Sequence, residues 1–372
     1  MTARKAFSPV RPKSVRAQIT DHVRAQVTGG TLAPGDKLPS TQELARTWNT
    51  HVATVHAALT PLVKEGLISR TRKRGTIVER PEARLERVGV YLPSKLLSGG
   101  DGVFVRSVCV HLESVMRTRG GAVDMWVDPR PHSARATCWK ELREAARRRA
   151  VHAVVAPRTD RRTHPWLSAL PVPTAFISGD ARPRCVSFDM RQFARAGVAE
   201  LARAGCRSIG MISVLSHTRP DSVPGGTAML RAFRERAADL GIETRPDWIK
   251  TPGRGQVAES DAEGFGYDSM RSVLGGRSRP RGLLVFTDVA ARGALMAAAE
   301  SGAAGAGELS LVLHRNAEVG LFCPYPASYL DVSASAVADA LVDLLARQMR
   351  GEDAANVMMA YRVSRSRKGT RK

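Results

Sequence analysis

The chain has 372 residues, more than one ordinary hydrophobic core supports, which predicts two or more domains. Its 43% hydrophobic and 25% charged residues indicate a folded globular protein and exclude a disordered chain. No apolar run approaches the roughly 18 residues of a membrane span, and no apolar stretch follows Arg4 and Lys5 as a secretory signal requires. We therefore expect a cytoplasmic protein without a membrane partner.

The formal net charge of +22 is concentrated at the two ends of the chain. Residues 1–80 contain 14 Lys and Arg against 5 Asp and Glu, and residues 362–372 contain 6 basic residues and no acidic one. Such an excess suits a polyanionic partner. No basic amphipathic helix with an aromatic face appears, so nucleic acid is favoured over a membrane surface.

The metal and disulfide chemistry that small Cys- and His-rich proteins use is not expected. The five cysteines are scattered and form no C-x-x-C pair, and the nine histidines have no ligand spacing. We expect the cysteines to be small buried side chains in a reducing compartment, with no disulfide framework and no metal site.

In the first eighty residues, three helices are predicted. Apolar residues recur at helical spacing over 15–27, and glycines at 29 and 30 end this first helix. Ser40 and Glu43 have the spacing of a capping box, so a second short helix begins at Ser40. A third runs over about 50–64 and includes Pro61, whose missing N–H removes one backbone hydrogen bond. Two short helices joined by a tight turn are typical of a helix-turn-helix.

Two short strands follow the third helix and are separated by a basic turn. They lie over 67–70 and 76–78, around Thr71-Arg72-Lys73-Arg74-Gly75. We interpret this hairpin as a wing, whose tip can enter a minor groove or lie along phosphates. The alternative is a solvated charged turn, which the preceding helices disfavour.

This region resembles the GntR-type winged helix over nearly its whole length. Pro34-Gly35, Leu38-Pro39-Ser40, Glu43-Leu44-Ala45, Glu65-Gly66-Leu67 and Gly75-Thr76 stand at the family's spacing. The resemblance implies that the third helix reads the major groove of double-stranded operator DNA while the wing touches the flanking minor groove. The DNA-binding residues that it implies are Ser40, Thr41, Gln42, His51, Val52, Ala53, Thr54, His56, Arg70, Arg72, Lys73, Arg74 and Gly75.

Three positions depart from the pattern of arginines that many members use for base contacts. They hold Gln42, Val52 and His56. Gln can read adenine through two hydrogen bonds and Val can contact only a thymine methyl, so the operator need not resemble the family's usual one. His56 is interpreted as an exposed helix residue near phosphates, with a ligand or pH-switch role as the alternative.

From residue 88 onward, strand-like apolar runs alternate with helical patterns. Strands are predicted over 88–92, 123–127, 153–156, 174–177, 209–212, 282–286 and 309–313. Helices are predicted over 104–119, 139–149, 191–204, 228–240, 267–274 and 290–301. This alternation indicates an α/β fold with parallel sheets, and a break near 178–186 divides it into two doubly wound subdomains. A ligand is expected in the cleft between them, at the carboxyl ends of the strands.

This second region resembles the LacI/GalR-type effector domain, which is similar to periplasmic sugar-binding proteins. The stretches that carry the resemblance are RVGVYLPS, VSFDMRQFARAGVAELARAGCRSIGMIS, GYDSMRSVLGGRSRPRGLLVFTDVAARGALMAAAESG and YPASYLDVSASAVADALVDLLARQMRGE. The resemblance implies a small-molecule effector, a sugar by class, and a homodimer formed through this domain.

The effector site is where the pattern departs most. Met229 stands where members usually carry a ligand-clamping arginine, and Arg315, beside His314, stands where another aspartate is frequent. The effector-binding candidates are Ser94, Phe104, Asp189, Met229, Asp288 and Arg315, the last as a substitute cation. Asp288 also has the position of a helix N-cap, a role compatible with ligand binding, and Phe104 is alternatively only core.

An enzyme is not expected. Nucleophile-elbow, zinc-protease and phosphate-loop motifs are absent, no lysine has a context suited to pyridoxal phosphate, and the glycine run 302–307 follows a helix where a dinucleotide loop would follow a strand. No cofactor is predicted.

The predicted architecture is therefore α/β, an N-terminal winged helix-turn-helix followed by a two-subdomain periplasmic-binding-protein-like domain with parallel doubly wound sheets. Its parts are a basic tail (1–12), the winged helix-turn-helix (13–80), a linker (81–87), the effector-binding and dimerisation domain (88–363) and a second basic tail (364–372).

The predicted function is transcriptional regulation, as a repressor whose operator affinity a sugar effector relieves. The sign stays open, since it depends on which conformation fits the operator. The alternative is a regulator with a degenerate pocket, constitutive or controlled by a partner. An architectural DNA-binding protein would not explain the α/β domain, and a sugar-binding module would not explain the winged helix.

Overall fold

The computed structural model describes residues 13–29, 31–71, 74–79, 85–94, 102–157, 162–179, 181–216, 224–253, 261–302 and 308–365. The chain divides into two compact units, Met1–Arg84 and Leu85–Lys372. Most of the predicted linker, the whole predicted N-terminal tail and most of the predicted C-terminal tail lie outside the described residues. Within the described part of the chain, no helix combines the length and apolarity that crossing a membrane requires.

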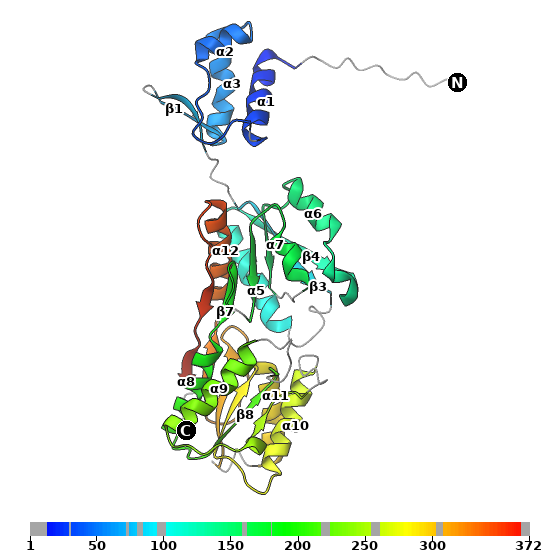
Figure 1. The fold of residues 1–372 in the computed structure, drawn as a ribbon, viewed down its shortest axis with the longest axis vertical. Helices are drawn as coiled ribbons and strands as arrows, with labels where there is room; N and C mark the ends of the chain where they lie inside the picture. Colours follow the sequence, from blue (N-terminus) through cyan, green and yellow to red (C-terminus); the bar gives the residue numbers. More distant parts are fainter. Residues whose placement is uncertain are drawn as a thin grey trace, which may run out of the picture. The chain divides into compact units, whose positions relative to one another are not determined.

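The first unit contains the three predicted helices and the predicted hairpin (Figure 1). Its elements are α1 (Val15–Thr28), α2 (Thr41–Thr47), α3 (Val52–Lys64), β1 (Ile68–Thr71) and β2 (Gly75–Val78). The capping box is confirmed, because Ser40 Oγ accepts from the Glu43 amide at 3.2 Å and the Glu43 carboxylate accepts from the Ser40 amide at 2.7 Å. Between α2 and α3 the chain turns at Asn49, which adopts a positive φ of 42°. A winged helix-turn-helix results.

The second unit consists of two lobes, each built on a six-stranded sheet. Lobe 1 has the sheet order β13-β7-β6-β5-β3-β4 with all pairs parallel, and lobe 2 has the order β14-β12-β11-β10-β8-β9, in which the β12–β14 pair is antiparallel and the others are parallel. The strands are β3 (Arg87–Pro93), β4 (Ala122–Asp128), β5 (Ala153–Ala156), β6 (Thr174–Ile177), β7 (Cys185–Phe188), β8 (Ile209–Ser213), β9 (Ile249–Lys250), β10 (Gly282–Phe286), β11 (Ser310–Asn316), β12 (Ala327–Val332), β13 (Val357–Met359) and β14 (Arg362–Arg365).

Helices cover both faces of the lobe 1 sheet. Successive residues of a strand point to opposite faces, so Val90 packs with α5 (Gly102–Thr118) and α12 (Ala334–Met349), whereas Tyr91 packs with α6 (Lys140–Arg147) and α7 (Thr163–Ser168). In lobe 2, α8 (Met190–Arg203) lies beside α9 (Pro224–Asp239), and α10 (Ala262–Leu274) lies beside α11 (Asp288–Glu300) (Figure 1). Short 3-10 helices span His132–Ala136 and Pro246–Trp248.

The chain passes between the lobes three times. It leaves lobe 1 after β7, returns after β12 to form α12 and β13, and enters lobe 2 again as β14 (Figure 1). The predicted break near 178–186 is therefore too early, because β7 still pairs with β6 through Phe176 and Cys185. All seven predicted strands are present, but β7, β9, β12, β13 and β14 had not been predicted as strands. Of these, β9, β13 and β14 are edge strands of two to four residues, too short to produce a clear alternation of polarity.

A candidate nucleic-acid interface and an effector pocket

The exposed side of α2 and α3 carries the residues that the resemblance implies for base contacts. Gln42, Val52 and His56 are exposed, and Val52 keeps 41% of its surface accessible. The opposite side of α3 is buried in the core of the unit through Val55, Ala58, Leu59 and Leu62. Since the core already fixes that side, the outward side of α3 is the one available to a groove of DNA.

The β1–β2 hairpin, which is the predicted wing, forms a hydrogen bond to the start of α2. Arg70 donates to Thr41 Oγ1 at 3.2 Å, so this cation spans β1 and α2 and is half-buried. Gly75 has a φ of +84°, and a Cβ there would lie 2.9 Å from Lys37 Cε, so the turn requires glycine. Arg74 is exposed beside it, and Arg72 and Lys73 lie outside the described residues.

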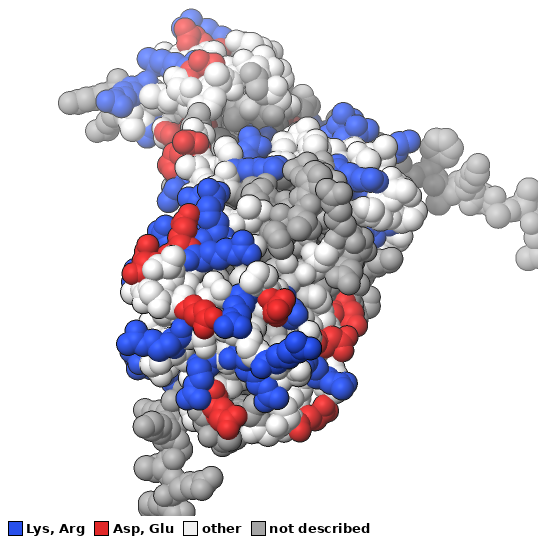
Figure 2. Space-filling view, turned by 60° about the horizontal axis from the view of Figure 1, so that its bottom comes forward, with Lys and Arg blue, Asp and Glu red and all other residues white. Residues whose placement is uncertain are grey.

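The remaining predicted DNA-contacting residues have smaller accessible surfaces or structural roles. Ser40 caps α2, Thr54 is half-buried, and His51 and Ala53 are exposed at the start of α3. The exposed predicted residues of the α2–α3 pair therefore include Gln42, His51, Val52, Ala53 and His56. Figure 2 shows basic side chains across one face of the molecule with acidic ones scattered among them, so charge alone does not single out this surface.

A pocket of about 230 Å³ lies between the two lobes of the second unit. It is lined by Val103, Phe104, Phe188, Met190, Val214, Leu215, Phe286, Thr287, Asp288, Val289, His314, Asn316, Val332 and Tyr361. Phe188, Phe286, Asn316 and Val332 each end a strand, so the carboxyl ends of strands from both sheets meet here. This is where open parallel sheets place their ligands.

The polar groups of the pocket come from lobe 2 and are organised around Asp288. Asn316 Nδ2 donates to Asp288 Oδ2 at 2.7 Å, and the Asp288 amide donates to His314 Nδ1 at 3.2 Å. Burial lowers the pKa of His314 although Asp288 and Asp331 oppose this shift, so the imidazole is neutral at pH 7. With Nδ1 accepting, the ring proton is on Nε2.

The helix cap next to this site is Thr287, not Asp288. Thr287 Oγ1 accepts from the Ala290 amide, and Asp288 is the first residue of α11. The predicted capping role of Asp288 is therefore wrong. Its carboxylate is instead held within the pocket by Asn316.

Of the six predicted effector-binding residues, Phe104 and Asp288 line the pocket. Phe104 also packs against the cores of both lobes, so it is both a pocket residue and a core residue. His314, Asn316 and Tyr361 also line the pocket but were not predicted from the sequence. The alternation of β11 could have indicated the first two, since residues two apart share a face of a strand.

The other four candidates are not among the residues that line the pocket, although Asp189 lies between two that are, Phe188 and Met190. Ser94 Oγ accepts from Arg135 in lobe 1, Asp189 Oδ1 caps α8 through the Gln192 amide, and Met229 is fully buried in the core of lobe 2. Arg315 lies on the opposite face of β11 from His314, where it forms two hydrogen bonds to Asp331 and stacks over Tyr329. It therefore does not act as a substitute cation for a ligand.

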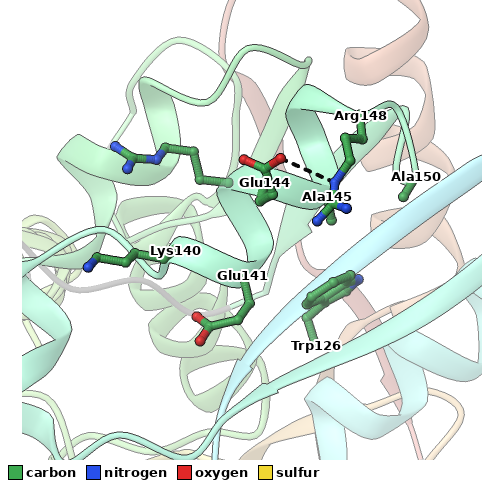
Figure 3. A pocket seen from close by; sticks show the side chains of 8 residues that line it. Trp126, Lys140, Glu141, Glu144, Ala145, Arg148 and Ala150 are labelled. Atoms are coloured by element: carbon green, nitrogen blue, oxygen red, sulfur yellow. Dashed lines mark ion pairs between the residues drawn. The ribbon is translucent and has the colours of Figure 1, made fainter.

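A second hollow lies on the surface of lobe 1, between α6 and β4 (Figure 3). Trp126 lies at one side of it, and the exposed side chains of Lys140, Glu141 and Arg143 surround it. Glu144 and Arg148 form an ion pair across 3.2 Å at its edge. Because this hollow is open and exposed charged side chains surround it, it lacks the enclosed character of a ligand site. Among the described residues, no group of His, Cys, Asp and Glu is arranged to hold a metal ion.

The two units match two different family models. Residues 15–78 match the model of bacterial regulatory proteins of the gntR family, and residues 198–363 match the periplasmic binding protein-like domain. A winged helix-turn-helix joined to such a two-lobed domain defines a helix-turn-helix transcriptional regulator with an effector-binding domain. The chain therefore combines a GntR-type helix-turn-helix domain with a periplasmic-binding-protein-like domain.

Individual relatives agree with this assignment. The chain is 38% identical over 71 residues to the transcriptional repressor NagR of Bacillus subtilis, a match that covers 19% of this chain and 29% of NagR. The structure is similar to that of the regulator Cra of Pseudomonas putida in complex with fructose 1-phosphate, with a TM-score of 0.57, 18% identity and coverage of 76% of this chain and 100% of Cra. It is also similar to the regulator CelR in complex with cellobiose, with a TM-score of 0.58, 15% identity and coverage of 95% and 99%.

Proposed function

We propose that the protein is a DNA-binding repressor whose affinity for a palindromic operator is set by a small molecule bound between the lobes. The outward side of α3, with Val52 and His56 exposed opposite a fully packed core, is the single observation that carries the DNA-binding half. α3 would lie in the major groove, and Arg74 of the wing would reach a phosphate or the flanking minor groove.

The effector half is supported by the pocket, which joins both lobes through Phe104, Phe188 and Asp288. A ligand that contacts both lobes favours one lobe arrangement over others, because it binds that arrangement more tightly. In a homodimer formed through the second unit, a change of lobe arrangement would alter the distance between the two winged helices. Because the spacing of the operator half-sites is fixed by the DNA, this change of distance would change the affinity for the operator.

A sugar is the effector class that the LacI/GalR resemblance implies, and Cra and CelR are described with bound sugars. The second candidate is a degenerate pocket, favoured by the presence of Met229 in the core where an arginine is usual. In that case the regulator is constitutive or controlled by a partner. A cytoplasmic location fits either candidate.

Selection of bound sequences from a pool of random duplex DNA tests the DNA-binding half. We expect a palindromic site for the full chain. Gln42→Ala is expected to reduce the base preference at one operator position by about 1–3 kcal/mol. Arg74→Ala should weaken binding to all DNA sequences alike, and should reduce the slope of log affinity against log salt concentration by about one. Selection of no sequence over competitor DNA would contradict the proposal.

Thermal unfolding against sugars, sugar phosphates and nucleosides tests the effector half. A true effector at about a hundred times its dissociation constant should stabilise the protein by roughly 2.7 kcal/mol. A hit that also lowers operator affinity supports the repressor, and one that raises operator affinity identifies a corepressor. If no compound shifts the melting temperature while operator binding persists, the degenerate pocket is supported.

A further inference from the structure

The pocket between the lobes has a polar edge and an otherwise apolar lining. Its polar side chains are Thr287, Asp288, His314 and Asn316, which are consecutive or alternate residues on lobe 2, together with the buried hydroxyl of Tyr361. The other nine lining residues are aliphatic, aromatic or methionine. A bound molecule therefore meets hydrogen-bonding groups along one side only.

The charge of the lining is negative. Asp288 is its only carboxylate, and it includes no Lys or Arg among the described residues that line it. Three arginines directly follow lining residues in the sequence: Arg315 is turned to the other face of β11 and paired with Asp331, and Arg191 and Arg362 are exposed. Among the described lining residues, an anionic ligand would therefore face a buried carboxylate and no compensating cation, which is a costly arrangement.

The polar edge contains donors as well as acceptors, and one carboxylate oxygen of Asp288 has no hydrogen bond within it. Asp288 Oδ2 accepts from Asn316, while Oδ1 lies 3.8 Å from His314 Nδ1, too far for a hydrogen bond. His314 Nδ1 is itself an acceptor, so it has no proton to give to Oδ1. Oδ1 is thus left to accept from a ligand that carries an N–H or O–H group.

Three of the nine apolar lining residues are phenylalanines, and they come from both lobes. Phe104 and Phe188 of lobe 1 contact each other with ring centroids 6.0 Å apart, and Phe286 and His314 of lobe 2 do so at 4.9 Å. The volume of about 230 Å³ is smaller than the roughly 300–1,000 Å³ of pockets for drug-sized ligands. Such walls suit a small flat molecule. Any polyol hydroxyl that meets the nine apolar lining residues without a partner would cost about 1–3 kcal/mol.

We propose that the effector is a small flat compound with an apolar body, no anionic group and a donor edge, an amine or amide by class, placed on Asp288. This inference rests on the proposed effector function of the pocket and narrows its ligand class. We therefore expect a compact aromatic amine or amide to bind more tightly than a sugar, and a sugar to bind more tightly than a sugar phosphate.

The test uses three monocyclic probes of nearly equal size and different charge, benzylamine, benzamide and benzoate, with glucose and glucose 6-phosphate. Thermal unfolding of the full chain is measured with each at the same concentration. We expect benzylamine and benzamide to raise the midpoint by about 2 °C or more, and benzoate and both sugars to leave it unchanged.

Two variants show whether the effect arises at this pocket. Asp288→Asn keeps the acceptor for Asn316 but removes the charge, and should weaken benzylamine about tenfold while weakening benzamide less. The matched control Asp343→Asn changes an aspartate of α12 that is 60% exposed, and should leave both shifts as in the wild type.

Three outcomes would overturn the ligand class. If benzoate or a sugar stabilises the protein in an Asp288-dependent way, the effector function stands and the class is wrong. If Asp288→Asn leaves the benzylamine shift unchanged, the probe binds elsewhere and the assignment to this pocket is wrong. If no probe shifts the midpoint, the class is also wrong, and the broader compound panel then decides whether the pocket binds any effector.

Discussion

Asn316 donates its side-chain amide to Asp288 Oδ2 across 2.7 Å, and both side chains are buried at the edge of the pocket between the lobes. This pair joins the end of β11 to the start of α11. A buried carboxylate needs such a donor, because water cannot replace it at low cost. The contact therefore links the stability of lobe 2 to the geometry of the pocket.

Replacing Asn316 by Ala should lower the free energy of unfolding by about 1.5–3 kcal/mol, because it leaves Asp288 Oδ2 without its donor. Asp288→Asn alone should cost less, since the asparagine oxygen can still accept. Chemical denaturation of the two single variants and the double variant measures this. If the double variant loses more stability than the two single variants lose in sum, the pairing of Asn316 with Asp288 is contradicted.

Lowering the pH should destabilise the second unit through His314. Burial lowers the pKa of this imidazole in the folded protein below its ordinary value of 6.5, so the unfolded chain takes up a proton that the folded one resists. Stability is then constant above about pH 7.5 and falls below about pH 6.5, by up to roughly 1.4 kcal/mol per pH unit for this group. Burial lowers the pKa of His164 as well, and it acts in the same direction.

His314→Gln should reduce the slope of stability against pH between 7.5 and 5.5, as followed by urea unfolding at each pH. His56→Gln, at an exposed position of α3, is the control and should leave the slope unchanged. Equal slopes for wild type and His314→Gln would contradict the neutral buried imidazole.

A second pH dependence, at more acidic values, is expected from Glu200 of α8. Its carboxylate is bonded by Arg365 of β14, Arg203 and Ser328, and hydrogen bonds led by Arg365 lower its pKa from 4.5 to about 2. The stabilisation is complete above about pH 4.5 and is lost as the pH falls toward 2. With the carboxylate 9% exposed and both arginines about half exposed, we expect about 1–3 kcal/mol at pH 7.

Glu200→Gln should therefore be less stable than the wild type at pH 7, with a difference that shrinks toward zero near pH 2. Guanidinium unfolding across this range measures it. The control Glu113→Gln removes an exposed ion pair of α5 and should change stability by less than about 1 kcal/mol at any pH. A Glu200→Gln difference that is independent of pH would show that packing, not charge, is lost.

The capping box of α2 should control the stability of the helix-turn-helix. Ser40→Ala removes the acceptor for the Glu43 amide and is expected to cost about 0.5–2 kcal/mol, whereas Ser40→Asp should retain the cap. Hydrogen exchange of the Glu43 amide in the full chain reports this locally. Unchanged protection in Ser40→Ala would mean that tertiary packing alone holds the start of α2.

Local sequence signals predicted the first unit and the alternation of the second because those signals are themselves local. Ser40 and Glu43 satisfy each other within one helical turn, and the buried side of α3 repeats at the helical period. The apolar runs of β3, β5 and β10 are buried on both faces, so they appear as strands in the sequence without reference to a partner.

The tertiary structure decided what no local signal contains. β14 exists because its backbone pairs with β12, and Tyr361 reaches the pocket because the chain crosses between the lobes a third time. Arg315 and His314 are neighbours in sequence, yet the strand turns one toward Asp331 and the other toward Asp288. A binding site assembled from seven separate segments depends on the faces that those segments present, and only packing of the complete fold fixes these faces.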